Sequence, residues 1–332
     1  MPREWSAEEI MTLGRSYQQA CVLAAAADLD VFTALADGPR TAEEVAAHIR
    51  ASPRGTSILL DALAAIELID KTGHQYSISS SVADALSETG SRSALAIARH
   101  QAACLRSWAR LAWSVRSGTS VEREPGIRGE QADRESFIEA MDNVNVAIAD
   151  QVVADLQPIS FNHLLDVGGA SGTWAFAWLR ARPQATATIF DLPHAIELAE
   201  VKAAKEGLAD RITLVAGDFY VDPLPEGGDL AWVSAIVHQN SREQNRRLFA
   251  SVHQALEDGG RILIRDMVMD ESRTSPPAGA LFAINMLVNT EAGGTFTFAE
   301  LASDLEASGF GGPALVRDEP SMNAVISAEK RP

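Results

Sequence analysis

From residue 163 onward, short apolar or β-rich runs alternate with helical segments of about 15–20 residues. Parallel strands need long crossovers, usually helices, so this alternation predicts a parallel sheet with helices on both faces. The last two runs are separated only by a turn at 318–320 and predict an antiparallel hairpin at the sheet edge. The expected fold class is α/β, doubly wound and mostly parallel. The predicted strands are 163–167, 185–190, 212–216, 230–237 and 261–267, followed by the hairpin strands 313–317 and 322–328.

The first third of the chain is different, because it is mostly helical in pattern over residues 6–115. A short hairpin is expected at 68–78, so the order helix, turn, helix, hairpin predicts a winged-helix-like domain. The polar stretch 116–135 predicts a surface loop, and a helix is expected at 136–156. Two capping boxes with S/T-x-x-E spacing mark helix starts, Ser6 with Glu9 and Thr41 with Glu44. The expected domains are 1–100, winged-helix-like and dimerising, and 101–332, catalytic.

Winged helices often bind DNA, but the charge of this chain argues against that use. The stretch 41–54, where a recognition helix would begin, carries Arg50 and Arg54 against Glu43 and Glu44. The whole chain has 28 Lys and Arg against 45 Asp and Glu, a formal net charge of −17. A phosphate backbone would be repelled by this field. A packing or dimerisation role is therefore favoured, with no nucleic-acid partner.

The composition also argues against a membrane protein, a secreted protein and a cysteine-based metal site. No apolar run reaches the roughly 18 residues of a membrane span, and the polar start of the chain lacks the features of a signal peptide. Cys21 and Cys104 are the only cysteines, which make neither a disulfide framework nor a metal cluster. The sequence predicts a cytoplasmic protein with no membrane partner and no metal.

The strongest local motif is the stretch 164–174, in which a strand leads through a glycine-rich turn into a helix. Glycines let the backbone pass close to a ligand, and the helix start offers free N–H groups. The G-x-G-x-x-G spacing of nicotinamide sites fails here, so a cofactor without phosphate is the better match, and Asp166 beside the turn would suit a cationic one. An ordinary tight turn remains the alternative. The residues assigned to cofactor binding here are Asp166, Gly168, Gly169 and Gly172.

Polar residues recur at the ends of the next predicted strands. Asp191 closes the second strand, where a carboxylate can accept hydrogen bonds from ribose hydroxyls, and Leu192 follows it. Asp218 and Phe219 follow the third strand and could bind and stack on adenine, while Ser234 belongs to the fourth. Because parallel strands end at one edge of a sheet, these residues are expected to form one cofactor site.

His238 and Asp266 close the fourth and fifth strands. Histidine has the pKa range of a general base, and Asp266 could orient its ring and stabilise the imidazolium. The alternative is that His238 merely lies near the N-cap of a helix that begins at Ser241, where Gln244 completes a capping box. His253, in the middle of that helix, is expected to face solvent.

The order of these motifs, Asp166 to Gly172, Phe190 to His194, Gly217 to Phe219, then His238, resembles the plant-type and bacterial small-molecule O-methyltransferases. That family includes acetylserotonin- and hydroxyneurosporene-type enzymes, and the resemblance covers nearly the whole chain. It implies a class I methyltransferase fold and S-adenosylmethionine as cofactor, with S-adenosylhomocysteine as its product. It also implies a homodimer formed through the N-terminal domain.

The resemblance assigns roles residue by residue. The three glycines of the turn match the loop around the methionine part, Asp191 the ribose ligand, and Asp218 with Phe219 the adenine contacts. His238 matches the catalytic base, and Asp266 takes the place of a supporting acid that is usually Glu.

Three departures from the family pattern concern this machinery. Ala170 replaces a usual glycine, and Gln239-Asn240 replaces the usual Asp-Trp after the histidine. The stretch 295–297 lacks a second supporting Glu, and Phe296 cannot polarise the histidine. Cofactor binding is therefore a firmer expectation than the identity of the reaction.

The leading hypothesis is methyl transfer to an oxygen of a hydrophobic, aromatic or polyketide-like small molecule. Holding the acceptor in line supplies most of the rate, and a base adds about 10²–10⁴-fold. The alternatives are a non-catalytic or regulatory S-adenosylmethionine-binding protein, C- or N-methylation on the same fold, and a DNA regulator. The predicted substrate-binding residues are Phe137, Met141, Phe282, Asn285, Met286 and Asn289, of which the two methionines could equally be core residues.

Overall fold

The computed structural model describes residues 3–90 and 94–331. These residues form two compact units. The first comprises the described residues up to Ala109 together with Glu122–Asn143, and the second comprises Arg110–Val121 together with the described residues from Val144 onward. The boundary predicted at residue 100 falls inside a helix, α7 (Leu95–Trp108), which packs along α2 (Tyr17–Asp28) and so stays with the first unit.

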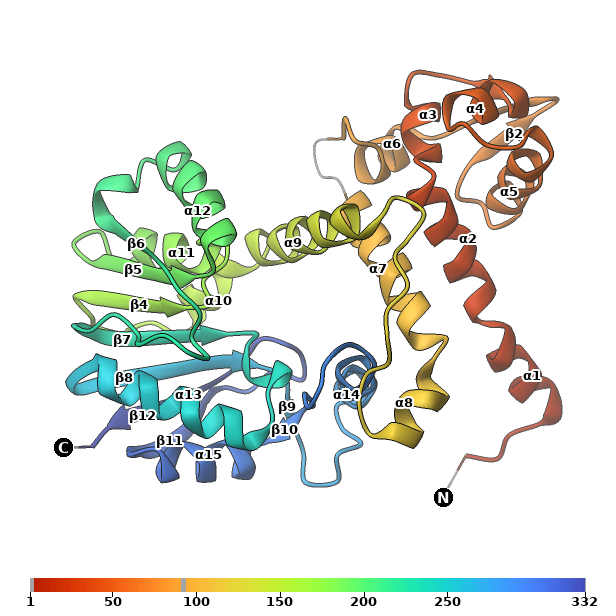
Figure 1. Ribbon diagram of the computed structural model, residues 1–332. Coiled ribbons are helices and arrows are strands. Elements are labelled where there is room, and N and C mark those ends of the chain that lie inside the picture. Colours follow the sequence, from red (N-terminus) through yellow and green to blue (C-terminus); the bar gives the residue numbers. More distant parts are fainter. Residues whose placement is uncertain (1–2, 91–93, 332) are drawn as a thin grey trace. The chain divides into compact units, whose positions relative to one another are not determined.

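The first unit is a set of helices with a small antiparallel sheet of order β1-β3-β2 (Figure 1). Both predicted capping boxes are present, and the predicted hairpin is confirmed as β2 and β3, with Gly73 at its turn in the left-handed region (φ 61°). Its core contains Phe32, Leu35, Leu60 and Leu63, all at most 1% exposed. The elements not yet bounded are α1 (Ala7–Arg15), α3 (Val31–Ala36), β1 (Arg40–Thr41), α4 (Ala42–His48), α5 (Pro53–Ala65), β2 (Asp70–Thr72), β3 (Gln75–Ser77), α6 (Ser80–Leu86) and most of α9 (Glu130–Val146).

The second unit is built on a seven-stranded sheet of order β11-β12-β8-β7-β4-β5-β6 (Figure 1). The pairs among β6, β5, β4, β7 and β8 are parallel, whereas β12 runs antiparallel to both β8 and β11. The predicted parallel sheet and its antiparallel edge hairpin are thus confirmed. The strands are β4 (His163–Val167), β5 (Thr186–Asp191), β6 (Ile212–Ala216), β7 (Gly228–Ser234), β8 (Leu256–Asp266), β11 (Phe310–Arg317) and β12 (Ala324–Lys330).

Two apolar clusters cover the two faces of this sheet. Successive strand residues point to opposite faces, so Leu164 and Trp232 join one cluster while Leu165 and Val233 join the other. Helices α10, α11 and α12 contribute to the first cluster, and α13 and α15 to the second. The remaining elements are α8 (Leu111–Ser117), α10 (Ala149–Asp155), α11 (Thr173–Ala181), α12 (Pro193–Lys205), η1 (Ala209–Arg211), η2 (Val237–Gln239), α13 (Arg242–Ala255), β9 (Val268–Met269), α14 (Pro277–Asn289), β10 (Phe296–Thr297) and α15 (Phe298–Ala307).

The structure corrects several predicted boundaries. The expected loop at 116–135 shortens to 118–129, because α9 begins already at Glu130 with good helix formers. The expected helix 136–156 is two helices, α9 and α10, since Ile148 leaves helical geometry at φ −126°. The fourth strand ends at Ser234 instead of 237, because Ala235 has a left-handed φ of 58° and turns the chain into η2.

His253 is also placed differently from the prediction. Its ring packs edge-on against Phe310 at 5.2 Å between ring centroids, and its Nε2 atom is buried. It therefore belongs to the packing between α13 and β11 instead of the solvent-facing side.

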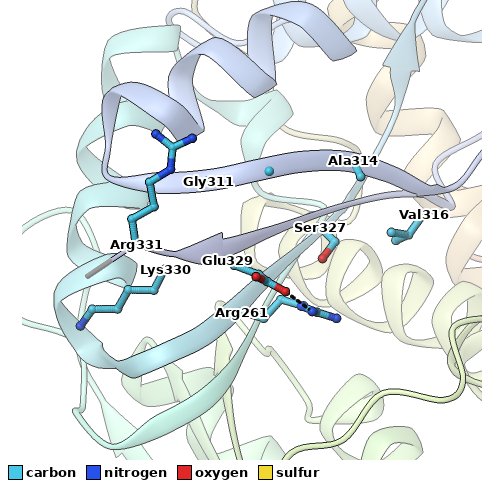
Figure 2. A pocket seen from close by; sticks show the side chains of 9 residues that line it. Arg261, Gly311, Ala314, Val316, Ser327, Glu329, Lys330 and Arg331 are labelled. Atoms are coloured by element: carbon cyan, nitrogen blue, oxygen red, sulfur yellow. Dashed lines mark hydrogen bonds and ion pairs between the residues drawn. The ribbon is translucent and has the colours of Figure 1, made fainter.

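A shallow hollow lies beside the antiparallel edge of the sheet (Figure 2). Arg261 and Glu329 form an ion pair in it, and the side chain of Arg331 lies over Gly311. Arg261 pairs with Leu230 near the start of β7, so the hollow lies toward the amino ends of the parallel strands. It is therefore separate from the strand ends where the sequence places the site. No helix in the described part of the chain is both long and apolar enough to cross a bilayer.

A buried carboxylate joins α13 to α15, and its removal should destabilise the second unit. The Asp304 side chain is 1% exposed and accepts hydrogen bonds from Arg242 at 2.9 Å and from Arg246 at 2.8 Å. Asp304→Ala leaves two arginines at the interface without their anion, and we expect a loss of about 2 kcal/mol in the free energy of unfolding. Urea denaturation measures it. Glu243→Ala, which breaks only an exposed pair with Arg247, is the control and should cost under about 0.5 kcal/mol; equal losses would contradict the assignment.

Candidate active site

The glycine-rich turn after β4 is closed to side chains on its inner face. A Cβ atom on Gly169 would lie 2.7 Å from Asp166 Oδ2, and one on Gly172 would lie 2.7 Å from the ring of Phe176. Gly168 and Gly172 also have left-handed φ angles of 68° and 83°, which favour glycine. Ala170 adopts φ 48° without being glycine, so this departure from the family pattern is accommodated at some backbone strain. The turn offers backbone, with little side-chain bulk, to a ligand.

Asp166 lies buried under this turn with unused hydrogen-bonding capacity. It is 1% exposed, and its Oδ2 atom has no hydrogen-bond partner among the described residues. Burial, with a smaller contribution from the negative charge of Asp191, raises the pKa of the Asp166 carboxyl to about 7. A buried acceptor without a donor is costly, so this position fits a ligand that carries an N–H group or a positive charge.

Asp191, at the end of β5, ties the turn to the neighbouring strand. Its Oδ2 accepts a hydrogen bond from the Ala170 backbone N–H at 2.8 Å, and its Oδ1 accepts one from the Leu192 N–H at 2.6 Å. Each carboxylate oxygen keeps a second lone pair, so two hydroxyl donors such as those of a ribose can still bind. Leu192 itself is 41% exposed beside it.

The loop after β6 brings an aromatic residue to the same place. Phe219 lies 3.4 Å from the position of a Cβ atom on Gly168, so it forms a wall beside the glycine turn. Asp218 Oδ1 accepts a hydrogen bond from the Tyr220 N–H, and the Asp218 N–H donates to Asp222. These hydrogen bonds fix the loop so that the Asp218 carboxylate and the Phe219 ring lie next to each other. A base could then stack on the ring while it contacts the carboxylate.

Ser234, at the end of β7, is held by a residue that sequence reasoning missed. Arg265 donates a hydrogen bond from Nη1 to the Ser234 Oγ at 3.0 Å, and its guanidinium stacks 4.4 Å from the centroid of Trp174. Arg265 is 3% exposed, and burial lowers its pKa to about 10. Because Oγ accepts from Arg265, the Ser234 hydroxyl proton is available to a ligand. In the sequence, an arginine within an apolar strand was only a weak sign that Arg265 contacts Ser234.

His238 and Asp266 are brought together as the sequence predicted. His238 Nδ1 lies 2.9 Å from both carboxylate oxygens of Asp266, and the two residues are 8% and 1% exposed. Asp266 is itself fixed by the Met267 backbone N–H at 2.7 Å. A proton on Nδ1 donated to the carboxylate leaves the lone pair on Nε2, which suits a general base. Ile236 contacts Gly168 two residues before His238, so this turn adjoins the glycine turn.

The turn that carries His238 is supported by backbone from a distant segment. The Gly294 N–H donates to the His238 carbonyl at 2.9 Å, and a Cβ atom on Gly293 would lie 2.5 Å from that oxygen. Phe296 lies in the stretch where the family often has a second supporting Glu. Here it is buried in β10 and packs in the apolar core. The carboxylate of Glu300 caps α15 by accepting the Thr297 N–H and pairs with Arg273.

The predicted substrate residues fall into both units. Phe282, on α14, packs edge-on against the His238 ring at 4.9 Å between centroids. Asn289 donates to Asn285, and the Asn289 Oδ1 atom is buried without a partner among the described residues. Met286 is only 6% exposed, as a core residue would be. Phe137 and Met141, 46% and 37% exposed, belong to α9 in the first unit. These assignments stay predictions.

Comparison with known proteins decides the family. A sequence model of the O-methyltransferase domain matches residues 110–311, and a model of the O-methyltransferase dimerisation domain matches residues 15–88. This chain belongs to the O-methyltransferase family. It is 32% identical over 312 residues, 91% of either chain, to the 8-O-methyltransferase of tetracenomycin polyketide synthesis from Streptomyces glaucescens.

Other members of the family are also similar over most of their length. The 3-hydroxy-5-methyl-1-naphthoate 3-O-methyltransferase of Streptomyces sahachiroi is 32% identical, covering 93% of this chain and 91% of its own. The crystal structure of human N-acetylserotonin methyltransferase in complex with S-adenosylmethionine superposes with a TM-score of 0.81 at 26% identity, over 99% of both chains. This O-methyltransferase therefore has the class I fold with an N-terminal helical domain.

The residues present fit S-adenosylmethionine, the cofactor that the family implies. The glycine turn has the close backbone that a bound methionine part needs, and Asp166 Oδ2 is a buried acceptor still lacking a donor. Asp191 would take the ribose, and Asp218 with Phe219 the adenine.

The raised pKa of Asp166 predicts a pH dependence of stability in the enzyme without cofactor. A carboxyl whose pKa rises from 3.8 to about 7 on folding is most favourable to the folded state below pH 4, and this contribution is lost as the pH rises to 7. Asp166→Asn cannot ionise. The stability of the wild type relative to this variant should therefore fall between pH 5 and pH 7 by about 1 kcal/mol per pH unit and level off above pH 7. Urea unfolding across this range measures it, and parallel curves would show that Asp166 keeps an ordinary pKa.

Proposed function

We propose that this enzyme methylates a phenolic or enolic hydroxyl of a polycyclic aromatic small molecule, with S-adenosylmethionine as donor. The observation that carries the proposal is His238, bonded through Nδ1 to Asp266 and adjoining the glycine turn. The two relatives described above are named for O-methylation of a polyketide and of a hydroxynaphthoate, which supports an acceptor of this class. Phe282 beside His238 supplies an aromatic surface for it.

S-adenosylmethionine supplies a methyl group on a sulfonium, already activated toward attack. The chain's own residues then hold the acceptor hydroxyl and remove its proton. Asp266 keeps the His238 proton on Nδ1 and orients the ring, so Nε2 accepts the hydroxyl proton as the oxygen attacks. The imidazolium that forms is paired with a carboxylate that is 1% exposed, where the attraction is little weakened by water. Positioning supplies most of the remaining rate.

Substitution of His238 tests this mechanism. With S-adenosylmethionine and 3-hydroxy-5-methyl-1-naphthoate as probe acceptor, His238→Ala should lower kcat by about 10²–10⁴-fold. Calorimetry should show that S-adenosylhomocysteine still binds, because His238 is assigned to proton removal. His74→Ala, at an exposed histidine of the β2–β3 hairpin, is the control. An unchanged kcat in His238→Ala would remove this residue from the role of base.

Product analysis decides between oxygen and nitrogen acceptors. A 29% identical relative from Streptomyces rimosus is named as an N,N-dimethyltransferase, which makes amine methylation the second candidate. A neutral amine attacks through a lone pair that it already has, so methylation of amines alone, with little effect of His238→Ala, would favour that candidate. NMR of the product gives the methylated atom.

A homodimer is the assembly we propose, formed through the first unit. Helix α1 has no buried residue, and apolar side chains on α1 and at the start of α2 are more than half exposed. Such a surface is costly to leave in water, and the family match to the dimerisation domain supports self-association as what covers it. The exposed residues are Ile10, Met11, Leu13 and Tyr17.

Charge introduced on this helix should separate the dimer. Ile10→Asp combined with Leu13→Asp places carboxylates on the exposed apolar surface, and we expect sedimentation at the mass of one 35.5 kDa chain. Val201→Asp, at an exposed apolar residue of α12 in the second unit, is the matched control and should leave the dimer intact. A doubly charged variant that sediments like the wild type would contradict the assignment of α1.

A further inference from the structure

The loop after β6 and the turn that carries His238 are joined by a chain of hydrogen bonds. We infer that Tyr220, Asn240 and Asn245 form a positioning network that fixes the His238 turn and makes its geometry respond to occupation of the adenine side. The inference rests on the proposed function, in which His238 is the base. The three residues are not among those expected to bind the cofactor or the acceptor.

The network runs in one direction from a phenol to a backbone carbonyl. The Tyr220 hydroxyl donates to Asn240 Oδ1 at 2.5 Å, and Asn240 Nδ2 donates to Asn245 Oδ1 at 2.9 Å. Asn245 Nδ2 then donates to the carbonyl of Val237 at 3.0 Å. Val237 immediately precedes His238, so the last bond of the network ends one residue from the base.

Burial makes this arrangement specific. Asn240 and Asn245 are both 0% exposed, so water cannot replace a lost partner. The Val237 carbonyl can only accept, so it must face Asn245 Nδ2. Asn245 Oδ1 then faces Asn240 Nδ2, which in turn directs Asn240 Oδ1 to the Tyr220 hydroxyl. Breaking one of these hydrogen bonds would leave a buried polar atom without a partner, at a cost of about 1–3 kcal/mol. The hydrogen bonds of the network are therefore expected to form together.

The far end of the network is anchored in rigid structure. Asn245 lies in the first turn of α13, and its backbone N–H donates to the Ser241 carbonyl at 2.9 Å. The turn 237–239 is thus held by Asn245 from α13, by Asp266 from β8 and by the Gly294 N–H at the His238 carbonyl. Tyr220, which is linked to this turn through Asn240, comes instead from a loop.

Tyr220 connects this turn to the adenine-side residues. Its ring lies 4.5 Å from that of Phe219 between centroids, and its N–H donates to Asp218 Oδ1. Burial and, to a smaller extent, the charge of Asp218 raise the pKa of Tyr220, so the phenol remains a donor. The residue is still 52% exposed as a whole, which leaves it free to adjust when a ligand contacts Phe219 or Asp218. Ligand binding at Phe219 or Asp218 would therefore change the positions of Val237 and His238.

One residue of the network, Asn240, lies where this chain departs from the family pattern. Where the family usually has Asp-Trp after the histidine, this sequence has Gln239-Asn240. An indole has one donor and no acceptor, so it could not receive the Tyr220 hydroxyl as Asn240 does. Asn240 thus links the turn to Tyr220 through a hydrogen bond that a tryptophan could not accept.

Tyr220→Phe tests the inference, because it removes one hydroxyl and keeps the ring. The readout is the ¹³Cε1 signal of His238 in full-length enzyme, identified by its loss in His238→Gln and followed during titration with S-adenosylhomocysteine. In the wild type we expect the ligand to shift and sharpen this signal. In Tyr220→Phe the shift should fall to less than half at saturating ligand, and kcat with the naphthoate probe should fall about tenfold with little change in the acceptor KM.

A double-mutant cycle separates positioning from general stability. In the His238→Ala background, Tyr220→Phe should cause no further loss of kcat, because it acts through the histidine. Tyr76→Phe, which removes a hydroxyl that donates to Asp61 in the first unit, is the matched control and should change neither the signal nor kcat.

The outcomes keep the two proposals apart. An equal response of the His238 signal in the wild type and in Tyr220→Phe would overturn the network while leaving the proposed function intact. So would a loss of kcat in Tyr220→Phe of the same size with and without His238. Failure of the folded wild type to bind S-adenosylhomocysteine would instead overturn the proposed function itself.

Discussion

The parallel pairing of β4 between β5 and β7 is the constraint on which the site depends. It aligns Val167 with Phe190 and with Val233, so all three strands end at one level. Residues that follow these ends then meet although they are up to about a hundred positions apart in the chain. Phe219 and Ile236 accordingly both approach Gly168, and Asp191 reaches the Ala170 N–H. The same edge is completed on its other side by β8, which delivers Asp266 to His238.

The functional residues at this edge are held mainly by buried polar contacts. Asp266, Asn240 and Asn245 are at most 1% exposed, and Arg265 only 3%. In such surroundings a polar group must find its partner within the protein, which fixes geometry more firmly than surface contacts do. Asp166 differs from these residues, because its Oδ2 atom has no partner in the described part of the chain, and this marks where a ligand is expected.

The sheet could be predicted from the sequence, because apolar runs alternate clearly with turn residues. The place of the site could also be predicted, because the carboxyl ends of parallel strands lie at one edge of a sheet. It also placed His238 beside Asp266 and Asp191 beside the glycine turn. It missed Arg265 and the hydrogen bonds of Tyr220, Asn240 and Asn245, since a polar residue in a strand or turn shows no partner until distant segments are folded together. It misjudged His253 because helical position alone does not say which face β11 covers. It extended the fourth strand too far because a left-handed alanine such as Ala235 has no signature in composition.

The buried carboxyl of Asp166 has a consequence for the protonation of the site. With a pKa raised to about 7, this carboxyl is a mixture of its neutral and ionised forms near neutral pH when no ligand is bound. A cationic group bound beside it would favour the ionised form and displace the proton. Binding of a cation there would then be accompanied by proton release and would become stronger as the pH rises.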